Sequence, residues 1–351
     1  MDFAFTDEQA MIAETAQQFF AENATSSRTR EAMAADGFDR ATWQSFCQEL
    51  GLGGILVPEE FGGSALGMVD FATVAEAAGA QVAAIPLHGL AMIGSAIAAG
   101  GSDEQKSKWL PQLASGDVVA SGGGNADLKS DNGGLSGKIE FVPHGNVANL
   151  FILSDGSEAW IVEADADGLS VDTPVTMDQT RPQATLTLSN VKADPLADGA
   201  AALNIGKAAG WICLAAEALG GAQACLDRTC EYAKEREQFG RAIGSFQAYK
   251  HRLADMMIEI EQARSAVYWA ACAIDEGSDE AELALHAAKS FCADTFFKCA
   301  GDMIQLHGGI GFTWEHDAHL FFKRARSIQT MMQSGNWHRE EIATMILGEA
   351  A

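Results

Sequence analysis

Hydrophobic residues recur at helical spacing through the first third of the chain. The stretch TDEQ has Thr6 in an N-cap position with Gln9 three residues later, and an amphipathic pattern follows it. The stretch SDEQ repeats this capping pattern at Ser102 and Gln105. Together with an alanine-rich run between them, these patterns predict a helical N-terminal domain over residues 1–115.

The pattern changes after this domain. Between residues 116 and 198, short runs rich in β-forming residues, such as GKIEFVP, LFILS and ATLTLSNV, alternate with Gly, Asn, Asp and Ser. Asn132-Gly133 favours a hairpin turn, because a type I′ turn needs positive φ at both central positions. We expect a small antiparallel β domain here.

Helical spacing returns in residues 199–351. Gly240 is a natural helix end, and Ser245 can cap the helix that follows it. We expect four long helices, over about residues 202–239, 245–276, 278–306 and 313–333. Helices of this length most economically pack as a bundle. The fold class is therefore predicted to be mainly α with a small β domain.

Composition narrows the classes of function. The 351 residues carry 23 basic and 48 acidic side chains, a formal net charge of −25, which disfavours nucleic-acid or anionic-membrane partners. The seven cysteines show no C-x-x-C spacing and indicate buried free thiols in a reducing compartment. The N-terminus lacks the features of a signal peptide, and Lys207 and Glu217 interrupt the longest apolar helix. We expect a cytoplasmic protein outside the membrane.

Two basic stretches and a pair of glycines are candidates for ligand binding. Residues 232–252 carry a local charge of +3, and Lys323, Arg324 and Arg326 form a second basic cluster. Such clusters suit a phosphate or pyrophosphate, although basic residues also favour helix C-termini. The glycines in QLHGGIGF either admit close backbone approach to a ligand or simply end a helix. No metal site is expected, because a di-iron bundle needs two Glu-x-x-His motifs and the chain has no such pair.

The motifs in combination resemble those of the acyl-CoA dehydrogenase family. They are PEEFGG, SDEQKSKWLPQLASGD, DQTR, YAKEREQFGRAIGSFQAYKHRLADM and QLHGGIGF. The resemblance covers nearly the whole chain and implies a helical N-domain (1–115), a shortened antiparallel β middle domain (116–198) and a C-terminal four-helix bundle (199–351). It also implies FAD shared across the interfaces of a dimer of dimers, and an acyl-CoA thioester as substrate.

The resemblance assigns the cofactor residues one by one. Arg236 corresponds to the arginine that meets the flavin pyrophosphate of the neighbouring subunit, and Gln238 and Phe239 lie beside it. The residues along the adenosine side correspond to Ile243, Phe246 and Gln247. The segment whose backbone closes on the ADP part of FAD corresponds to Gln305, Leu306, His307, Gly308 and Gly309.

The family's catalytic glutamate has no counterpart at either of its usual positions. By the resemblance, the position after the paired glycines falls on Met332, or on Gln333 with one residue of slip. The position used by other members, on the first bundle helix, falls on Gly210. Neither Met nor Gln accepts a proton at neutral pH, so we expect no catalytic residue here.

The β unit also departs from the family. In place of the segments that normally face a subunit's own flavin and substrate, the chain has SGGGNADL and EFVPHG. We therefore expect the base-lacking subunit of an α2β2 enzyme, paired with a homologous catalytic subunit, acting on steroid or other bulky side chains and passing electrons to an electron-transfer flavoprotein or similar acceptor. The alternatives are a homotetrameric flavoenzyme with an unrecognised base, such as Glu217 or His307, and a flavin-free acyl-CoA-binding or scaffold protein.

Overall fold

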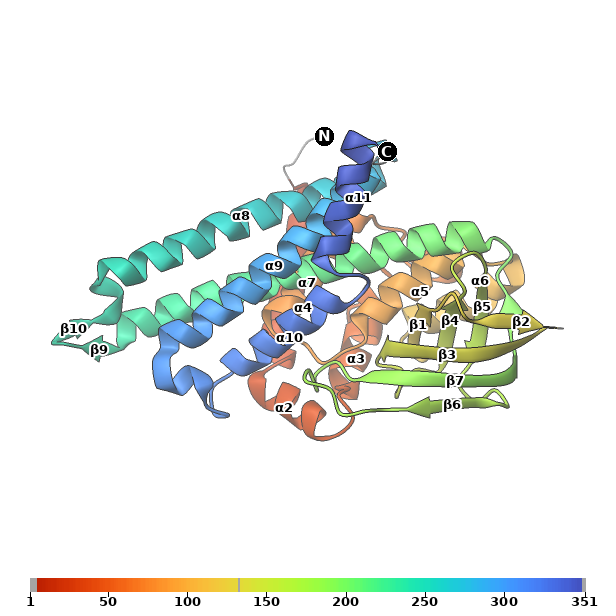
Figure 1. The fold of residues 1–351 in the computed structure, drawn as a ribbon, viewed down its shortest axis with the longest axis horizontal. Coiled ribbons are helices and arrows are strands. Elements are labelled where there is room, and N and C mark those ends of the chain that lie inside the picture. Colours follow the sequence, from red (N-terminus) through yellow and green to blue (C-terminus); the bar gives the residue numbers. More distant parts are fainter. Residues whose placement is uncertain (1–4, 132, 349–351) are drawn as a thin grey trace. The chain divides into compact units, whose positions relative to one another are not determined.

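The computed structural model describes residues 5–131 and 133–348, and Figure 1 labels their helices and strands in chain order. The chain divides into two compact units. The first gathers Met1–Ser26, Met68–Ala83 and Trp211–Ala351, and the second gathers Ser27–Gly67 and Ala84–Gly210. This grouping is by contact and not by chain order, and the three-domain division at residues 115 and 198 remains a prediction.

The first unit is helical. Its helices are α1 (Asp7–Asn23), α4 (Met68–Ala80), the greater part of α7 (Gly199–Glu235), α8 (Gln247–Asp275), α9 (Ala281–His307), α10 (Ala318–Thr330) and α11 (Gly335–Leu347). α8 packs along α9, and α10 and α11 both contact α9 (Figure 1). α9 is therefore the central helix of the C-terminal part of this unit.

Helices α4 and α7 cross at very short range. A Cβ atom on Gly220 of α7 would lie 1.8 Å from the carbonyl oxygen of Glu76, and one on Gly79 of α4 would lie 2.1 Å from that of Glu217. Both distances are far inside van der Waals contact, so each crossing position excludes every residue but glycine. Small residues thus set the distance between these two helices.

Several helix ends differ from the expected ones. α7 ends at Glu235 and a strand pair follows, whereas we expected the helix to continue to residue 239. Ser245 does not cap α8: its hydroxyl donates to the Ala242 carbonyl, and Phe246 occupies the N-cap without a side-chain hydrogen bond. The expected fourth helix is also two helices, α10 and α11, separated by a turn.

The second unit combines helices with two four-stranded sheets. Its helices are most of α2 (Ser26–Ala34), with α3 (Arg40–Gln44), α5 (Leu87–Gly100) and α6 (Asp103–Ala114). Its strands are β1 (Ala120–Gly124), β2 (Lys129–Asp131), β3 (Gly134–Pro143), β4 (Leu150–Ser154), β5 (Ala159–Glu163), β6 (Leu169–Asp172), β7 (Gln183–Lys192) and β8 (Asp194–Pro195). α5 packs against β1 and α6.

The sheets have the strand orders β1-β4-β5-β8 and β2-β3-β7-β6. β1 pairs with β4 in parallel, which corrects our expectation of a purely antiparallel unit. The chain connects these two strands through β2 and β3 of the other sheet, and such a long crossover permits parallel pairing. β2 and β3 form the expected hairpin, although Asn132 of its Asn132-Gly133 turn lies outside the described residues.

Both expected capping boxes are present. The Thr6 hydroxyl accepts from the Gln9 amide, and Ser102 makes the same contact with Gln105. α7 is long and apolar enough to cross a membrane, but 94% of its apolar window is buried inside the protein, as expected of a core helix.

Candidate functional site

A short hairpin joins α7 to α8. Its strands are β9 (Glu237–Gln238) and β10 (Arg241–Ala242), and Gln238 pairs with Arg241. The two residues between them, Phe239 and Gly240, have φ of 56° and 77°. A two-residue loop with positive φ at both positions is a type I′ turn, and it is unusual for a phenylalanine to adopt this conformation. The Phe239 side chain is 92% exposed at the tip.

Arg236 lies at the base of this hairpin. Its backbone carbonyl accepts from the Ile243 amide at 2.8 Å, which closes the hairpin. Its side chain is exposed, and within residues 5–131 and 133–348 the guanidinium makes no hydrogen bond or ion pair. All five of its N–H donors are therefore available to an anion.

The residues after the hairpin pack beside its tip. The Arg241 guanidinium lies over the Phe246 ring at 4.1 Å, and the Phe239 ring meets Phe246 edge-on with centroids 6.1 Å apart. Ile243 and Phe246 are half-buried, whereas Gln247 at the start of α8 is exposed. Phe246 thus orients the neighbouring Arg241 and Phe239.

The structure brings the glycine segment to the same end of the bundle. The Tyr232 ring of α7 stacks on His307 of α9 with centroids 4.4 Å apart, and the Tyr249 hydroxyl of α8 donates to the Leu306 carbonyl at 3.1 Å. His307 Nδ1 lies 2.8 Å from the Met303 carbonyl, to which it must donate, and burial lowers the pKa of this imidazole. Gln305 is exposed on the last turn of α9.

The paired glycines are not required by the packing of the chain itself. Gly308 has φ 62° and ψ −140°, a conformation suited to glycine alone, but Gly309 has no positive φ. A Cβ added to either would meet no heavy atom of the described residues within 4 Å. Gly311 differs, because its Cβ would lie 2.7 Å from the Ile304 carbonyl oxygen. The outer face of Gly309 is therefore open to a ligand.

The two basic stretches are less available than their sequences suggest. In the first, Lys234 pairs with Glu231 and Arg252 with Asp302. In the second, Arg324 is buried, with Nη2 3.4 Å from the Ala83 carbonyl oxygen. Arg236, by contrast, is exposed at this end of the bundle, and its guanidinium makes no hydrogen bond or ion pair within the described part of the chain.

The expected base position lies in the turn between α10 and α11. Met332 and Gln333 have φ of 50° and 80°, so two consecutive non-glycine residues adopt the left-handed conformation. The Met332 carbonyl accepts from the Trp211 indole at 3.1 Å and from His338 Nε2 at 3.2 Å. These two donors hold the turn in a conformation that its own residues disfavour.

A buried pair of imidazoles supports this turn. His338 Nε2 must donate to the Met332 carbonyl, so Nδ1 of the neutral ring is an acceptor for His286 Nδ1, which lies 2.9 Å away. Burial, followed by the nearby charge of Lys289, lowers the pKa of His338 to about 4. Burial also lowers the pKa of Lys289 to about 8, and its ammonium donates to the Ile328 carbonyl at 3.0 Å.

Sequence reasoning missed this cluster of Trp211, His286, Trp337 and His338. The four rings contact one another with centroids 4.9–6.3 Å apart. Only Trp337 and His338 are neighbours in the sequence, so only this pair could have indicated the cluster. Two further candidate positions for the base are buried. Gly210, the position used by other members of the family, lies inside α7. Glu217, an alternative base, is 2% exposed at the α4–α7 crossing.

The left-handed turn predicts that Gln333→Gly stabilises the protein. Glycine relieves the steric strain of a left-handed residue, and this gain exceeds the entropic cost of a more flexible unfolded chain. The free energy of unfolding should therefore rise by about 0.5–1 kcal/mol. Urea unfolding followed by tryptophan fluorescence measures it. Gln262→Gly, on the exposed face of α8, should instead lower stability by roughly 1 kcal/mol. Destabilisation by Gln333→Gly would contradict the assigned turn.

The low pKa of His338 predicts acid sensitivity. Between pH 6.5 and 4, His338 binds a proton in the unfolded chain but stays neutral in the folded protein. The free energy of unfolding therefore falls as pH falls through this window, by at most roughly 3 kcal/mol. Replacing His338 by Gln should flatten that decline. The exposed His251→Gln variant is the matched control and should keep the wild-type slope in urea unfolding across the same window.

Two family models match the chain. The model described as acyl-CoA dehydrogenase, N-terminal domain, matches residues 6–117, and that described as acyl-CoA dehydrogenase, C-terminal domain, matches residues 203–347. The chain is also 34% identical to acyl-CoA dehydrogenase IpdE2 of Mycobacterium tuberculosis over 335 residues, which cover 93% of this chain and 94% of the relative.

Solved structures share the fold. A chain of the ChsE4-ChsE5 complex from Mycobacterium tuberculosis matches with a TM-score of 0.91 at 26% identity, covering 100% of both chains. A chain of the Tcur3481-Tcur3483 steroid ACAD G363A variant matches at 0.89 and 30% identity, covering 97% and 98%. The FAD complex of PigA matches at 0.90 and 25% identity, covering 100% of both. These similarities confirm the expected fold class, and the chain belongs to the acyl-CoA dehydrogenase family of FAD-dependent oxidoreductases.

Proposed function

We propose that this chain is the base-lacking subunit of a heteromeric acyl-CoA dehydrogenase and completes the FAD site of a homologous, glutamate-bearing partner. One observation carries the proposal. Arg236, Phe239, Gln247 and Gln305, which are among the residues assigned to the cofactor, are exposed at one end of the bundle. Met332, at the expected base position, is held by its carbonyl in a turn without a carboxylate.

The chain's own residues fit one edge of FAD. The unpaired guanidinium of Arg236 would hold the pyrophosphate, and the open face beside Gly309 would admit the ADP part to the backbone of residues 305–309. The adenosine side would lie along Ile243, Phe246 and Gln247. When bound, FAD supplies an acceptor for the hydride that leaves the substrate's β-carbon.

Exposed aromatic side chains at this end support a protein partner. Phe239 is 92% exposed and Phe312, in the glycine segment, is 85% exposed. Large exposed aromatics close to a cationic group are typical of protein interfaces. Because the outward residues are those assigned to a neighbour's cofactor, the partner fits a homologous subunit.

The base must then come from that partner. Abstraction of an α-proton from an acyl-CoA needs a carboxylate held against the carbon acid, and a thioether or an amide cannot accept the proton. The names of two similar structures, the Tcur3481-Tcur3483 steroid ACAD and the ChsE4-ChsE5 complex, support a bulky steroid side chain as the acyl group and an assembly of two different chains, for which we propose α2β2. An electron-transfer flavoprotein or similar acceptor would reoxidise the flavin.

The alternative bases have less support. Glu217 is buried at the α4–α7 crossing, and the His307 ring stacks on Tyr232 and also contacts the tilted ring of His316. A homotetramer using either of them, or a flavin-free acyl-CoA-binding protein, would nevertheless give a distinct experimental result.

Co-expression with a homologous dehydrogenase that carries the glutamate tests the proposal. We expect the chain purified alone to be colourless, and the two chains to copurify as a yellow complex with a flavin absorbance spectrum. Arg236→Ala should weaken FAD retention in that complex by roughly 10- to 150-fold, the range for a charge-assisted contact, whereas Arg40→Ala should not. A yellow, active chain on its own, or unchanged FAD retention in Arg236→Ala, would contradict the proposal.

The glycine segment gives a second, independent test. Gly309→Ala should leave the free energy of unfolding within about 0.5 kcal/mol of wild type, because its Cβ meets open space, yet it should lower FAD retention in the complex. Gly311→Ala should destabilise the chain, because its Cβ would collide with the Ile304 carbonyl. Thermal unfolding and flavin absorbance after gel filtration separate the two effects. Full retention of FAD by Gly309→Ala would rule out backbone contact at this position.

A further inference from the structure

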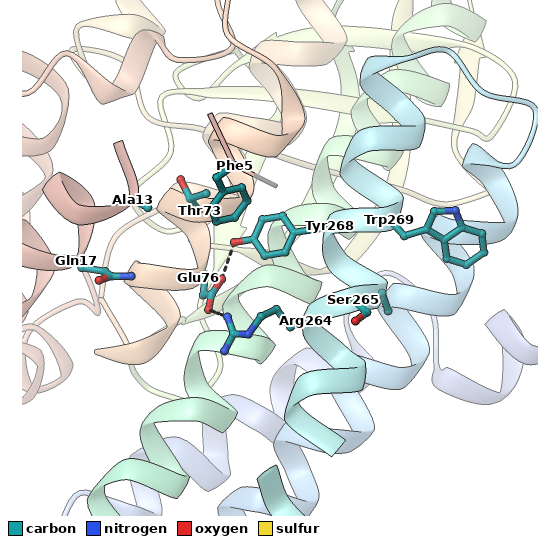
Figure 2. A pocket seen from close by; sticks show the side chains of 10 residues that line it. Phe5, Ala13, Gln17, Thr73, Glu76, Arg264, Ser265, Tyr268 and Trp269 are labelled. Carbon is teal, nitrogen blue, oxygen red and sulfur yellow. Dashed lines mark hydrogen bonds and ion pairs between the residues drawn. The ribbon is translucent and has the colours of Figure 1, made fainter. Parts of the chain in front are cut away.

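A cavity of about 710 Å³ lies between α1, α4 and α8 (Figure 2). It is lined by Phe5, Ala13, Gln17, Thr73, Glu76, Arg264, Ser265, Ala266, Tyr268 and Trp269. Half of these residues are apolar or aromatic, and the other half are polar or charged. This size and this mixture are typical of small-molecule sites.

The polar groups form one network. The Glu76 carboxylate accepts from Arg264 Nη1 at 2.5 Å through one oxygen and from the Tyr268 hydroxyl at 2.6 Å through the other (Figure 2). Burial, reinforced by Glu76, raises the pKa of Tyr268, so the phenol remains protonated. Phe5 packs edge-on against the Tyr268 ring at 4.9 Å. Glu76 thus links Arg264 and Tyr268 without any ligand.

Arg264 keeps spare donors in this network. Nη2 donates to Gln223 at 3.0 Å, and Nε lies 3.5 Å from Glu261, whose side chain is 56% exposed. The Arg264 guanidinium has five N–H donors. Within the described part of the chain, hydrogen bonds use one N–H of Nη1 and one N–H of Nη2. An oxygen acceptor of a ligand can therefore bind Arg264 without breaking its bond to Glu76.

The local charge selects the type of acceptor. Glu76 and Glu261 face a single cation, Arg264, so the charges sum to −1 and an anionic ligand would be repelled. A cation would be attracted by the carboxylates, but it has no acceptor to offer Arg264. A neutral carbonyl oxygen avoids the repulsion and still accepts a hydrogen bond from Arg264. The aromatic walls of the cavity suit a ring system attached to this carbonyl.

We propose that this cavity is a second ligand site, which binds a neutral, ring-containing apolar molecule. One carbonyl oxygen of this ligand accepts a hydrogen bond from Arg264. The cavity is separate from the cofactor end of the bundle. Arg264 lies 17 residues along α8 from Gln247, which corresponds to roughly 25 Å of helix. None of the cavity residues belongs to the hairpin, the glycine segment or the α10–α11 turn.

The fluorescent naphthyl ketone 6-propionyl-2-(dimethylamino)naphthalene is a suitable probe, since its emission shifts to the blue in an apolar site. We expect saturable binding to the full chain with one probe per chain. Ala13→Phe, which fills the cavity, should weaken binding at least tenfold, and Ala21→Phe, on the exposed face of α1, should not. Arg264→Lys, which keeps the charge but loses the planar fork of donors, should weaken binding by about tenfold.

Circular dichroism establishes that each variant is folded, and Ala266→Phe replaces Ala13→Phe if the latter is not. The naphthalene analogues 2-naphthoate and 2-naphthylmethylammonium test the ligand class by competition, and both should compete more weakly than the neutral 2-acetylnaphthalene. Absence of saturable binding, equal binding by the cavity-filling variant, or stronger competition by either ion would overturn the proposal.

Discussion

The close crossing of α4 and α7 is the constraint on which the helical unit depends. Gly79 and Gly220 allow the two backbones to approach to distances that any side chain would prevent. The crossing fixes the orientation of α7, whose Trp211 holds the α10–α11 turn and whose Tyr232 stacks on the glycine segment about 30 Å away along the same helix. One helix therefore contacts both the α10–α11 turn and the glycine segment.

Local features of the fold were predictable because they depend on neighbours in sequence. The capping boxes at Thr6 and Ser102 need only residues three positions apart. The hairpin after α7 was not predictable, because EREQFGRA consists largely of good helix formers and its phenylalanine takes a left-handed conformation that no propensity favours. There, packing of the turn against Phe246 overrides local preference.

The site was predictable only in part, and for a similar reason. Resemblance to the family singled out Arg236 and the glycine segment, but the pairing of Tyr232 with His307 joins residues on different helices. The clamp on Met332 comes from Trp211, 121 residues earlier, and from an imidazole whose protonation depends on burial. Such contacts are products of tertiary packing and leave no periodic signal in the sequence.

The clamped turn also bears on how the backbone keeps its path. A left-handed residue such as Gln333 normally restricts its position to glycine, but here two hydrogen bonds to the preceding carbonyl hold the backbone whatever the side chain. The shape of the turn therefore depends on contacts to its backbone from Trp211 and His338. A turn that is held through its carbonyl oxygen can thus keep its backbone path while its side chains change.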